Sequence, residues 1–292
     1  MIGELFAIIA PVFLIVAIGF AWARIGRPFD TEFVTAIVLM VATPCLVFSS
    51  LTGLGVDLTL SGEVALAQFL LLLTWGVVGS LGLRLAGNLP AHSYLPTLMF
   101  GNLGNMGLPL SFFAFGAPGL ALATVAFAVH SIAQFTVGIA IASGTASLKQ
   151  LLRTPVVWGV AAAIPFMATG ATVPPWIHNT TSVLGNILVP MMLLTMGVAL
   201  SRLQWPKLGR SSALAVVRLV GGLAFGLIVS EGLGLDGTAR GVVIIMSAMP
   251  VAIFNFIFAQ RYKRAPDEVA AAIVISTALS FLTLPGLLLI VL

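Results

Sequence analysis

Long apolar segments alternate with short polar stretches along the whole chain. Each segment approaches or exceeds the roughly 20 residues that a helix needs to cross about 30 Å of hydrocarbon. Short segments of strictly alternating polarity, which a membrane β-barrel would need, are not seen. The pattern therefore predicts an all-α protein with ten membrane-spanning helices. The segments are Leu5–Ala23, Phe33–Thr52, Val64–Leu85, Tyr94–Phe115, Leu120–Ala142, Pro155–Val173, Val183–Leu200, Ser212–Ser230, Ala239–Ala259 and Val269–Val291.

The fourth and ninth segments contain residues that disfavour a continuous helix. The stretch from Gly101 to Leu110 holds three glycines, two asparagines and Pro109. Glycine costs about 1 kcal/mol and proline about 3 kcal/mol in a helix interior. Broken backbone at membrane depth survives only where it is buried in protein or lines a wet cavity, and many secondary transporters bind substrate at such breaks. The stretch therefore predicts either a binding site or a kink used for packing.

A weak internal repeat is visible in the prolines. Three pairs recur 144, 146 and 141 residues apart, and half the chain is 146 residues. They are Pro11 with Pro155, Pro44 with Pro190, and Pro109 with Pro250. Because a repeat of five crossings is odd, its second copy must be inverted, and we expect repeats at residues 1–146 and 147–292. The stretch from Ser247 to Asn255 then becomes the second broken segment, and the site is expected at the interface of the repeats.

Composition excludes several classes of protein. Of the 292 residues, 60% are apolar and 8% are charged, whereas a soluble domain carries about 25% charged residues. The single Cys45 excludes a disulfide framework and a Cys-rich metal site, and no cofactor is expected. The net charge is +4, but the basic residues lie at segment ends rather than along one face, which argues against a nucleic-acid partner. No Lys or Arg precedes Glu4 and the first apolar stretch, so we expect no cleavable signal peptide.

The basic residues predict the orientation. Eleven of the thirteen Lys and Arg residues lie in or beside the loops that follow odd-numbered segments. By the positive-inside rule these loops are cytoplasmic and both termini are outside, in a multi-pass protein of the plasma (inner) membrane. Arg240 lies on the other side, and Arg218 lies inside the eighth segment. The eleven are Arg24, Arg27, Arg84, Lys149, Arg153, Arg202, Lys207, Arg210, Arg261, Lys263 and Arg264.

Carboxylates are missing from the segment centres. Proton relays and many cation sites use intramembrane carboxylates, so their absence argues against a sodium/proton antiporter and suits an anionic substrate. No acidic pair is buried, and adjacent His130 and Ser131 do not face each other on a helix, so an intramembrane enzyme is not predicted. A channel stays open as the alternative to a carrier. The nine acidic residues, all at segment ends or in loops, are Glu4, Asp30, Glu32, Asp57, Glu63, Glu231, Asp236, Asp267 and Glu268.

Three polar residues inside segments are candidates for function. Arg218 lies about 10 Å from the cytoplasmic end of its segment, where it either serves function or snorkels to the interface. His130 and Gln134 are four residues apart and share a helix face. A titrating histidine would couple transport to protons, and the alternative is a hydrogen bond between helices.

The asparagines of the two interruptions are suited to an organic anion. A carboxylate stripped of water needs several donors, because an unpaired buried polar group costs about 1–3 kcal/mol. Amide side chains and the N–H groups at the start of a half-helix supply such donors without a permanent charge. We therefore expect Asn102 to bind a carboxylate, with Asn105 and Asn255 in support.

These interruptions also resemble a known family. Asn102-Leu103-Gly104-Asn105-Met106-Gly107-Leu108-Pro109 resembles N-x-x-x-x-G-x-P, a signature of the auxin efflux carrier family. The run from Met249 to Tyr262, followed by Asp267 and Glu268, resembles it as well, and the resemblance covers essentially the whole chain. It implies an inverted-repeat fold similar to the bile acid/sodium symporters and sodium/proton antiporters, with segments four and nine crossing at the substrate site.

The resemblance also implies roles for parts of the chain. Segments one, two, six and seven would form a scaffold, and segments three to five and eight to ten a transport domain that moves as an elevator in a homodimer. Asn102 matches the asparagine that helps bind the substrate carboxylate, and Pro109 and Pro250 match the two crossover prolines. The short loop from Ser143 to Thr154 resembles bacterial members associated with malate and malonate. A dicarboxylate and an auxin-like acid are both open, as is coupling to protons or to sodium in a symporter of the bile acid type.

The orientation can be tested by labelling. Single cysteines placed near Lys149 and Lys207 should react with a membrane-impermeant thiol reagent only from the cytoplasmic face, and those near Asp57 and His178 only from outside. Reaction of the Lys149 site from outside would contradict the predicted orientation.

Overall fold

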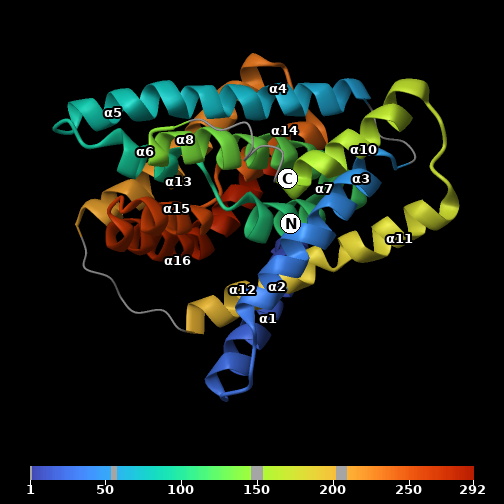
Figure 1. Cartoon of the computed structure of the whole chain (residues 1–292), viewed down its shortest axis with the longest axis horizontal. Helices are drawn as coiled ribbons and strands as arrows, with labels where there is room; N and C mark the ends of the chain where they lie inside the picture. Colours follow the sequence, from blue (N-terminus) through green and yellow to red (C-terminus); the bar gives the residue numbers. More distant parts are fainter. Residues whose placement is uncertain (1, 54–57, 146–153, 202–208) are drawn as a thin grey trace.

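The computed structural model describes residues 2–53, 58–145, 154–201 and 209–292, except for the side chains of 2–9 and 58. Within these ranges every regular element is a helix (Figure 1), so the prediction of an all-α protein is confirmed. Several residues used above lie outside the described residues: Asp57, Lys149, Arg153, Arg202, Lys207 and the side chain of Glu4.

The helices follow one another with short breaks. Several are continuous through a wide π-turn, labelled η. In chain order they are α1 (Ile2–Arg24), α2 (Thr31–Ile37), η1 (Val38–Ala42), α3 (Thr43–Leu51), α4 (Leu58–Thr74), η2 (Trp75–Gly79), α5 (Ser80–Leu85), α6 (Ala91–Met99), η3 (Leu103–Gly107), α7 (Leu108–Ala133), η4 (Gln134–Gly138), α8 (Ile139–Ser143), α10 (Pro155–Thr169), α11 (Pro175–Asn186), α12 (Leu188–Ser201), α13 (Arg210–Gly232), α14 (Gly237–Ser247), α15 (Phe254–Tyr262) and α16 (Pro266–Val291).

Local sequence accounts for many helix boundaries. The Asp30 side chain caps α2 by accepting a hydrogen bond of 2.9 Å from the Phe33 N–H, which satisfies one free donor of the first turn. Prolines occupy the first turns of α10, α11 and α16, where a missing N–H costs little. Two of the π-turns, η1 and η3, directly precede Pro44 and Pro109. The wider turn relieves the clash between a proline ring and the carbonyl four residues earlier.

Several helices are long and apolar enough to span a membrane. Six meet the requirement within the described residues: Thr31–Leu51, Thr59–Leu85, Leu103–Ser143, Pro175–Ser201, Arg210–Gly232 and Pro266–Val291. Three shorter apolar helices are Ala10–Arg24, Pro155–Thr169 and Gly237–Ser247. The 41-residue helix Leu103–Ser143 is kinked at Gly116, which has φ 64° and ψ −152°. The chain is thus a multi-pass membrane protein by the length and composition of its helices.

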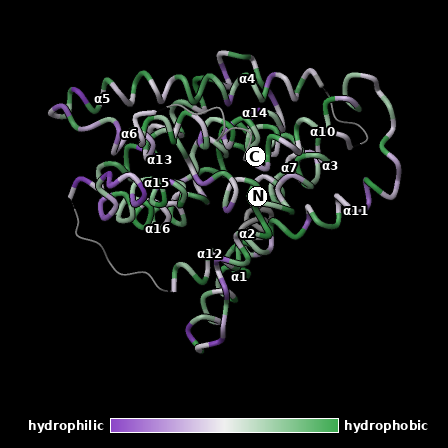
Figure 2. The backbone as a smooth tube through the Cα atoms, viewed as in Figure 1, coloured by the Kyte–Doolittle hydropathy of each residue, from purple (hydrophilic) through white to green (hydrophobic). Residues whose placement is uncertain are grey.

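The surface agrees with a lipid environment. Large apolar side chains are exposed along α4 and α5, among them Phe69, Leu73 and Leu81. In a soluble protein such a continuous apolar face would need a covering partner, and here the bilayer provides it. Figure 2 shows hydrophobic residues along most of α4, with hydrophilic residues gathered at the ends of α1 and α5 and around α15. Trp22 and Trp176 are exposed near helix ends, as expected of residues that anchor at the interface.

The helices pack into two groups. In the first, α1 packs on α12, and α3 packs on α10 and α11. In the second, α13 packs on α14 and α16, and α7 packs on α4 and α14. Figure 1 shows α1, α11 and α12 together, apart from α13, α15 and α16. Contacts between the groups involve mainly α7 and η3, which meet α1, α3, α10 and α12.

Reciprocal glycines bring α1 and α12 together. A Cβ added to Gly197 would collide with the Val16 carbonyl oxygen and lie 2.7 Å from the Phe20 nitrogen. A Cβ on Gly19 would collide with the Leu194 carbonyl group. Small residues at both positions let two backbones approach closely, which is how helices gain packing energy in lipid.

Gly197→Ala should therefore destabilise the protein by about 1–3 kcal/mol, because a methyl group must push two helices apart. The measurement is the apparent melting temperature of purified protein in detergent. Gly82→Ala is the matched control, since nothing lies within 4 Å of a Cβ built there and alanine favours a helix by roughly 0.5–1 kcal/mol over glycine. Equal melting temperatures for Gly197→Ala and the wild-type protein would disprove the tight contact.

Candidate functional site

Two broken helices lie side by side at the centre of the second group. Helix α6 ends at Met99 and continues into extended backbone at Phe100, whereas α14 ends at Ser247 and is followed by a turn at Ala248. Gly101 and Val251 form an isolated antiparallel bridge. The Asn102 N–H donates to the Pro250 carbonyl oxygen at 2.7 Å, and the Ala252 N–H donates to the Phe100 carbonyl oxygen at 3.0 Å. Each break thus supplies backbone partners that the other has lost, as buried polar groups require.

After the bridge, each of the two interrupted segments begins a second half-helix. Asn102 is the N-cap of η3, and its side-chain oxygen accepts from the Asn105 N–H at 3.4 Å. Pro109 is the second residue of α7, and the wide turn of η3 before it accommodates its ring. In the second interrupted segment, α15 begins at Phe254. The first turns of both half-helices lie at the positive ends of their helix dipoles.

Asn255 forms hydrogen bonds that connect the two interrupted segments. Its side chain is 2% exposed, and its Nδ2 donates to the Phe100 carbonyl oxygen at 3.0 Å. Its Oδ1 accepts from Gln134 Nε2 at 3.5 Å. One amide therefore connects α15, the end of α6 and η4, which fixes the second half-helix relative to the bridge.

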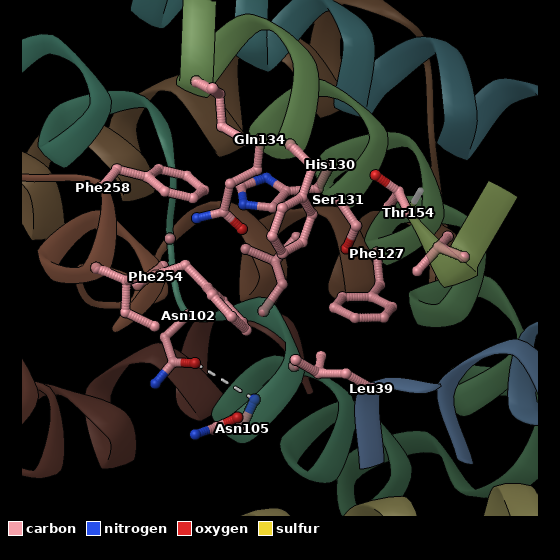
Figure 3. A pocket seen from close by; sticks show the side chains of 18 of the residues that line it. Leu39, Asn102, Asn105, Phe127, His130, Ser131, Gln134, Thr154, Phe254 and Phe258 are labelled. Carbon is pink, nitrogen blue, oxygen red and sulfur yellow. Dashed lines mark hydrogen bonds between the residues drawn. The ribbon is translucent and has the colours of Figure 1, made fainter. Parts of the chain in front are cut away.

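A cavity of about 340 Å³ lies beside this bridge. Its polar lining includes Asn102 and Asn105 from the N-terminus of η3, and His130, Ser131 and Gln134 from α7 and η4. Figure 3 shows the two asparagines on one side of the cavity and the row from α7 and η4 above them. The volume lies within the usual range of small-molecule sites, roughly 300–1,000 Å³.

The remaining walls are mainly apolar. Side chains of the first helix group close one side, and aromatic rings of the second group close the other. Phe135 is central to the rings, with centroids 5.1 Å from Phe254 and 5.9 Å from Phe258. The apolar and aromatic lining residues are Leu39, Met40, Leu103, Phe127, Phe135, Ile139, Pro155, Val156, Met192, Ala252, Phe254, Ile257, Phe258 and Tyr262.

His130 presents a donor at the cavity wall. The residue is 2% exposed, and its Nδ1 lies 3.3 Å from Gln68 Nε2. An amide nitrogen only donates, so with the Gln68 amide in this orientation Nδ1 accepts and the ring proton is on Nε2. This Nε2 has no hydrogen-bond partner among the described residues. The predicted hydrogen bond between helices is thus present at one ring nitrogen, and the other is buried beside the cavity.

Arg218 does not line this cavity. It is 2% exposed, so it does not snorkel to an interface. Its guanidinium instead donates to three main-chain carbonyl oxygens, those of Leu98 at 2.9 Å, Ser247 at 3.0 Å and Met249 at 3.1 Å. The first two lie at the C-terminal ends of α6 and α14, so Arg218 lies on the far side of the bridge from Asn102.

The structure brings together part of the candidate set. Asn102, Asn105, His130 and Gln134 all line the cavity, and Asn255 is bonded to Gln134 behind it. Pro250 contributes a carbonyl to the bridge. Pro109 and Pro250 shape the backbone and are not among the lining residues.

Most residues that form the cavity walls were not predicted from the sequence. Phe127, Ser131 and Phe135 line the cavity at intervals of four residues, as do Phe254 and Phe258. This spacing was available as a signal, because residues four apart share a helix face. Arg261, an exposed residue at the end of α15, also lines the cavity and had been interpreted only as a marker of orientation.

The chemistry of the site is that of binding. Its polar groups are amides, hydroxyls, one imidazole and the Arg261 guanidinium, which suit hydrogen bonds to an anion. Among the described residues, no three His, Cys, Asp or Glu side chains cluster where they could hold a metal ion.

Two comparisons relate this chain to known proteins. A family model described as membrane transport protein matches residues 139–288. Auxin efflux carrier component 1 of Arabidopsis thaliana is 26% identical over 133 residues, which is 43% of this chain and 21% of that relative. The match thus spans about a fifth of the length of the plant protein.

Proposed function

Because this chain belongs to the membrane transport protein family, that of the auxin efflux carriers, we propose that it is a secondary transporter of a small organic anion. The observation that carries the proposal is the cavity beside the two broken helices. Hydrogen-bond donors gather near the bridge, and apolar and aromatic side chains form the rest of the wall. Such a cavity suits a carboxylate attached to an apolar body.

The carboxylate would bind at the N-terminus of η3. Asn102 lines the cavity and is bonded there through its oxygen, so its Nδ2 is the group that can donate to a ligand. Gln134 and the Nε2–H of His130 are further donors on the facing wall. A helix N-terminus adds favourable partial charge for an anion. Asn105 and Asn255 would act in support, the first at the cavity and the second by holding α15 in place.

The proposed architecture is ten helices in two inverted repeats of five, residues 1–146 and 147–292. In support, the six long helices, the kink at Gly116 within one of them and the three shorter helices agree with ten apolar segments. The interruptions at Gly101 and Val251 occupy corresponding places in the two halves and pair with each other. The two groups of packed helices match the proposed scaffold and transport domain.

The proposed mechanism is elevator-type alternating access. Both helix groups line the cavity, with Met40, Val156 and Met192 from the first and Asn102, Asn105 and Gln134 from the second. A ligand held by the second group would therefore lie against the first, and sliding one group along the other would carry it across. Arg261 and Tyr262 line the same cavity, and the basic end of α15 is cytoplasmic under the positive-inside rule. We infer that this conformation opens to the cytoplasm.

The role of Asn102 is testable by binding. Asn102→Ala should weaken binding of the transported acid by about ten- to hundred-fold, because losing one donor to a buried carboxylate costs roughly 1–3 kcal/mol. Purified protein is titrated with indole-3-acetate, malonate and malate, with and without sodium, and ligand-dependent thermal stabilisation gives the affinity.

One further variant separates the binding role of Asn102 from its capping role, and another is a surface control. Asn102→Asp keeps an oxygen that caps η3 but replaces the donor with a negative charge, so it should bind the acid even more weakly while staying folded. Asn179→Ala, at an exposed position of α11, should behave as wild type. Normal binding by Asn102→Ala or Asn102→Asp would make Asn102 a purely structural cap and remove it from the substrate site.

A further inference from the structure

Arg218 is a buried cation that has no carboxylate partner among the described residues. All three of its hydrogen bonds go to main-chain carbonyl oxygens, and the Trp75 ring covers the guanidinium with its centroid 5.2 Å from Cζ. Salt bridges among the described residues join other pairs, Arg210 with Glu268 and Arg240 with Glu231. An uncompensated buried charge is very unfavourable, so the carbonyl groups must provide its compensation.

The ends of two helices supply that compensation. Leu98 and Ser247 are at the C-terminal ends of α6 and α14, and Met249 follows α14 directly. A helix C-terminus carries about half a negative elementary charge and a helix N-terminus about half a positive one. Two C-termini therefore amount to roughly one negative charge, which a single guanidinium balances.

This balance changes the net charge that an anion experiences near the bridge. The bridge gathers two helix C-termini, of α6 and α14, and two helix N-termini, of η3 and α15. Without a cation the partial charges of the four ends sum to zero. With Arg218 bound to the C-terminal carbonyls, the negative ends are neutralised and the two positive ends remain for the cavity.

Only the backbone of one residue separates the guanidinium from the cavity. Gly101 lines the cavity, and a Cβ added to it would collide with Nη2 of Arg218 and lie 3.2 Å from Cζ. Charges interact strongly over such separations where water is excluded. Arg218 is therefore close enough to act on a bound anion that it does not touch.

We propose that Arg218 is the residue that makes the site selective for anions, acting across Gly101 by neutralising the C-terminal ends of α6 and α14. It is a positioning residue, because it holds both half-helix ends and never contacts substrate. This inference rests on the proposed function, since it concerns the same cavity and the same carboxylate.

The test compares an acid with its uncharged amide. The probes are indole-3-acetate with indole-3-acetamide and malonate with malonamide, titrated onto purified wild-type protein, Arg218→Lys and Arg218→Gln. Arg218→Gln keeps amide donors for the carbonyls but removes the charge, and it should lower affinity for the acid at least tenfold more than affinity for the amide. Arg218→Lys keeps the charge and should retain the preference for the acid within about threefold. A structural role alone would weaken both probes equally, and an unchanged ratio in Arg218→Gln overturns the proposal.

A second variant leaves Arg218 and its three hydrogen bonds in place. Gln68 lines the same small void of about 10 Å³ as Arg218, Trp75 and His130. Gln68→Glu places a carboxylate beside the guanidinium with little change of shape, so at pH 8 it should also lower the preference for the acid at least tenfold. Gln68→Met is its uncharged control: it also removes the hydrogen bond to His130 Nδ1, so it should change affinity for the acid and the amide alike and keep the preference.

The outcomes separate the two proposals. If the wild-type protein binds none of the acids, the proposed function and this inference fail together. If the wild-type protein prefers the acid and Arg218→Gln keeps that preference, only the role of Arg218 is overturned.

Discussion

The backbone pairing between the two broken helices is the constraint on which the rest of the site depends. Inside a bilayer each unpaired N–H or C=O group costs several kcal/mol, because no water is available to replace a lost partner. The extended residues after α6 and α14 meet this requirement by bonding to each other, through Asn102 with Pro250 and Ala252 with Phe100. Neither break could persist alone at membrane depth. The pairing therefore also fixes where two half-helices begin, and it is their first turns that face the cavity.

Side chains form hydrogen bonds to main-chain carbonyl groups at the ends of the broken helices. Asn255 Nδ2 donates a second hydrogen bond to the Phe100 carbonyl oxygen, and the Arg218 guanidinium donates to carbonyl oxygens at both helix ends. These residues come from different helices, so the second helix group is held together through its breaks as well as through its apolar contacts. The proposed substrate site would need no charged side chain next to the bridge, because main-chain dipoles and amides supply donors there.

The sequence indicated the breaks but not everything around them. Glycine, asparagine and proline in apolar segments signal interruption by their local cost, so Asn102 and Asn255 could be selected without a structure. The pairing of Gly101 with Val251 could not, because it depends on how segments 150 residues apart align. Arg218 was ambiguous for the same reason, since its partners lie 29 to 120 residues away. The aromatic wall carried a readable spacing in Phe127 and Phe135, but the same spacing occurs on any packed helix face.

The kind of contact within each helix group differs from the contact between them. Across the described residues, the glycines on which a Cβ would collide with another helix's backbone face helices of their own group, as Gly197 faces α1, Gly159 faces α3 and Gly222 faces α14. Backbones locked together in this way cannot slide without separating. Between the groups, Gly104 of η3 meets Met192 of α12 at the end of its side chain, where a Cβ would lie 3.6 Å from Cε. Methionine adapts its shape to a changing neighbour. Close backbone packing inside each group and adaptable side chains between them are what the proposed elevator movement requires, because one group would move along the other while the paired breaks, which lie within one group, stay intact.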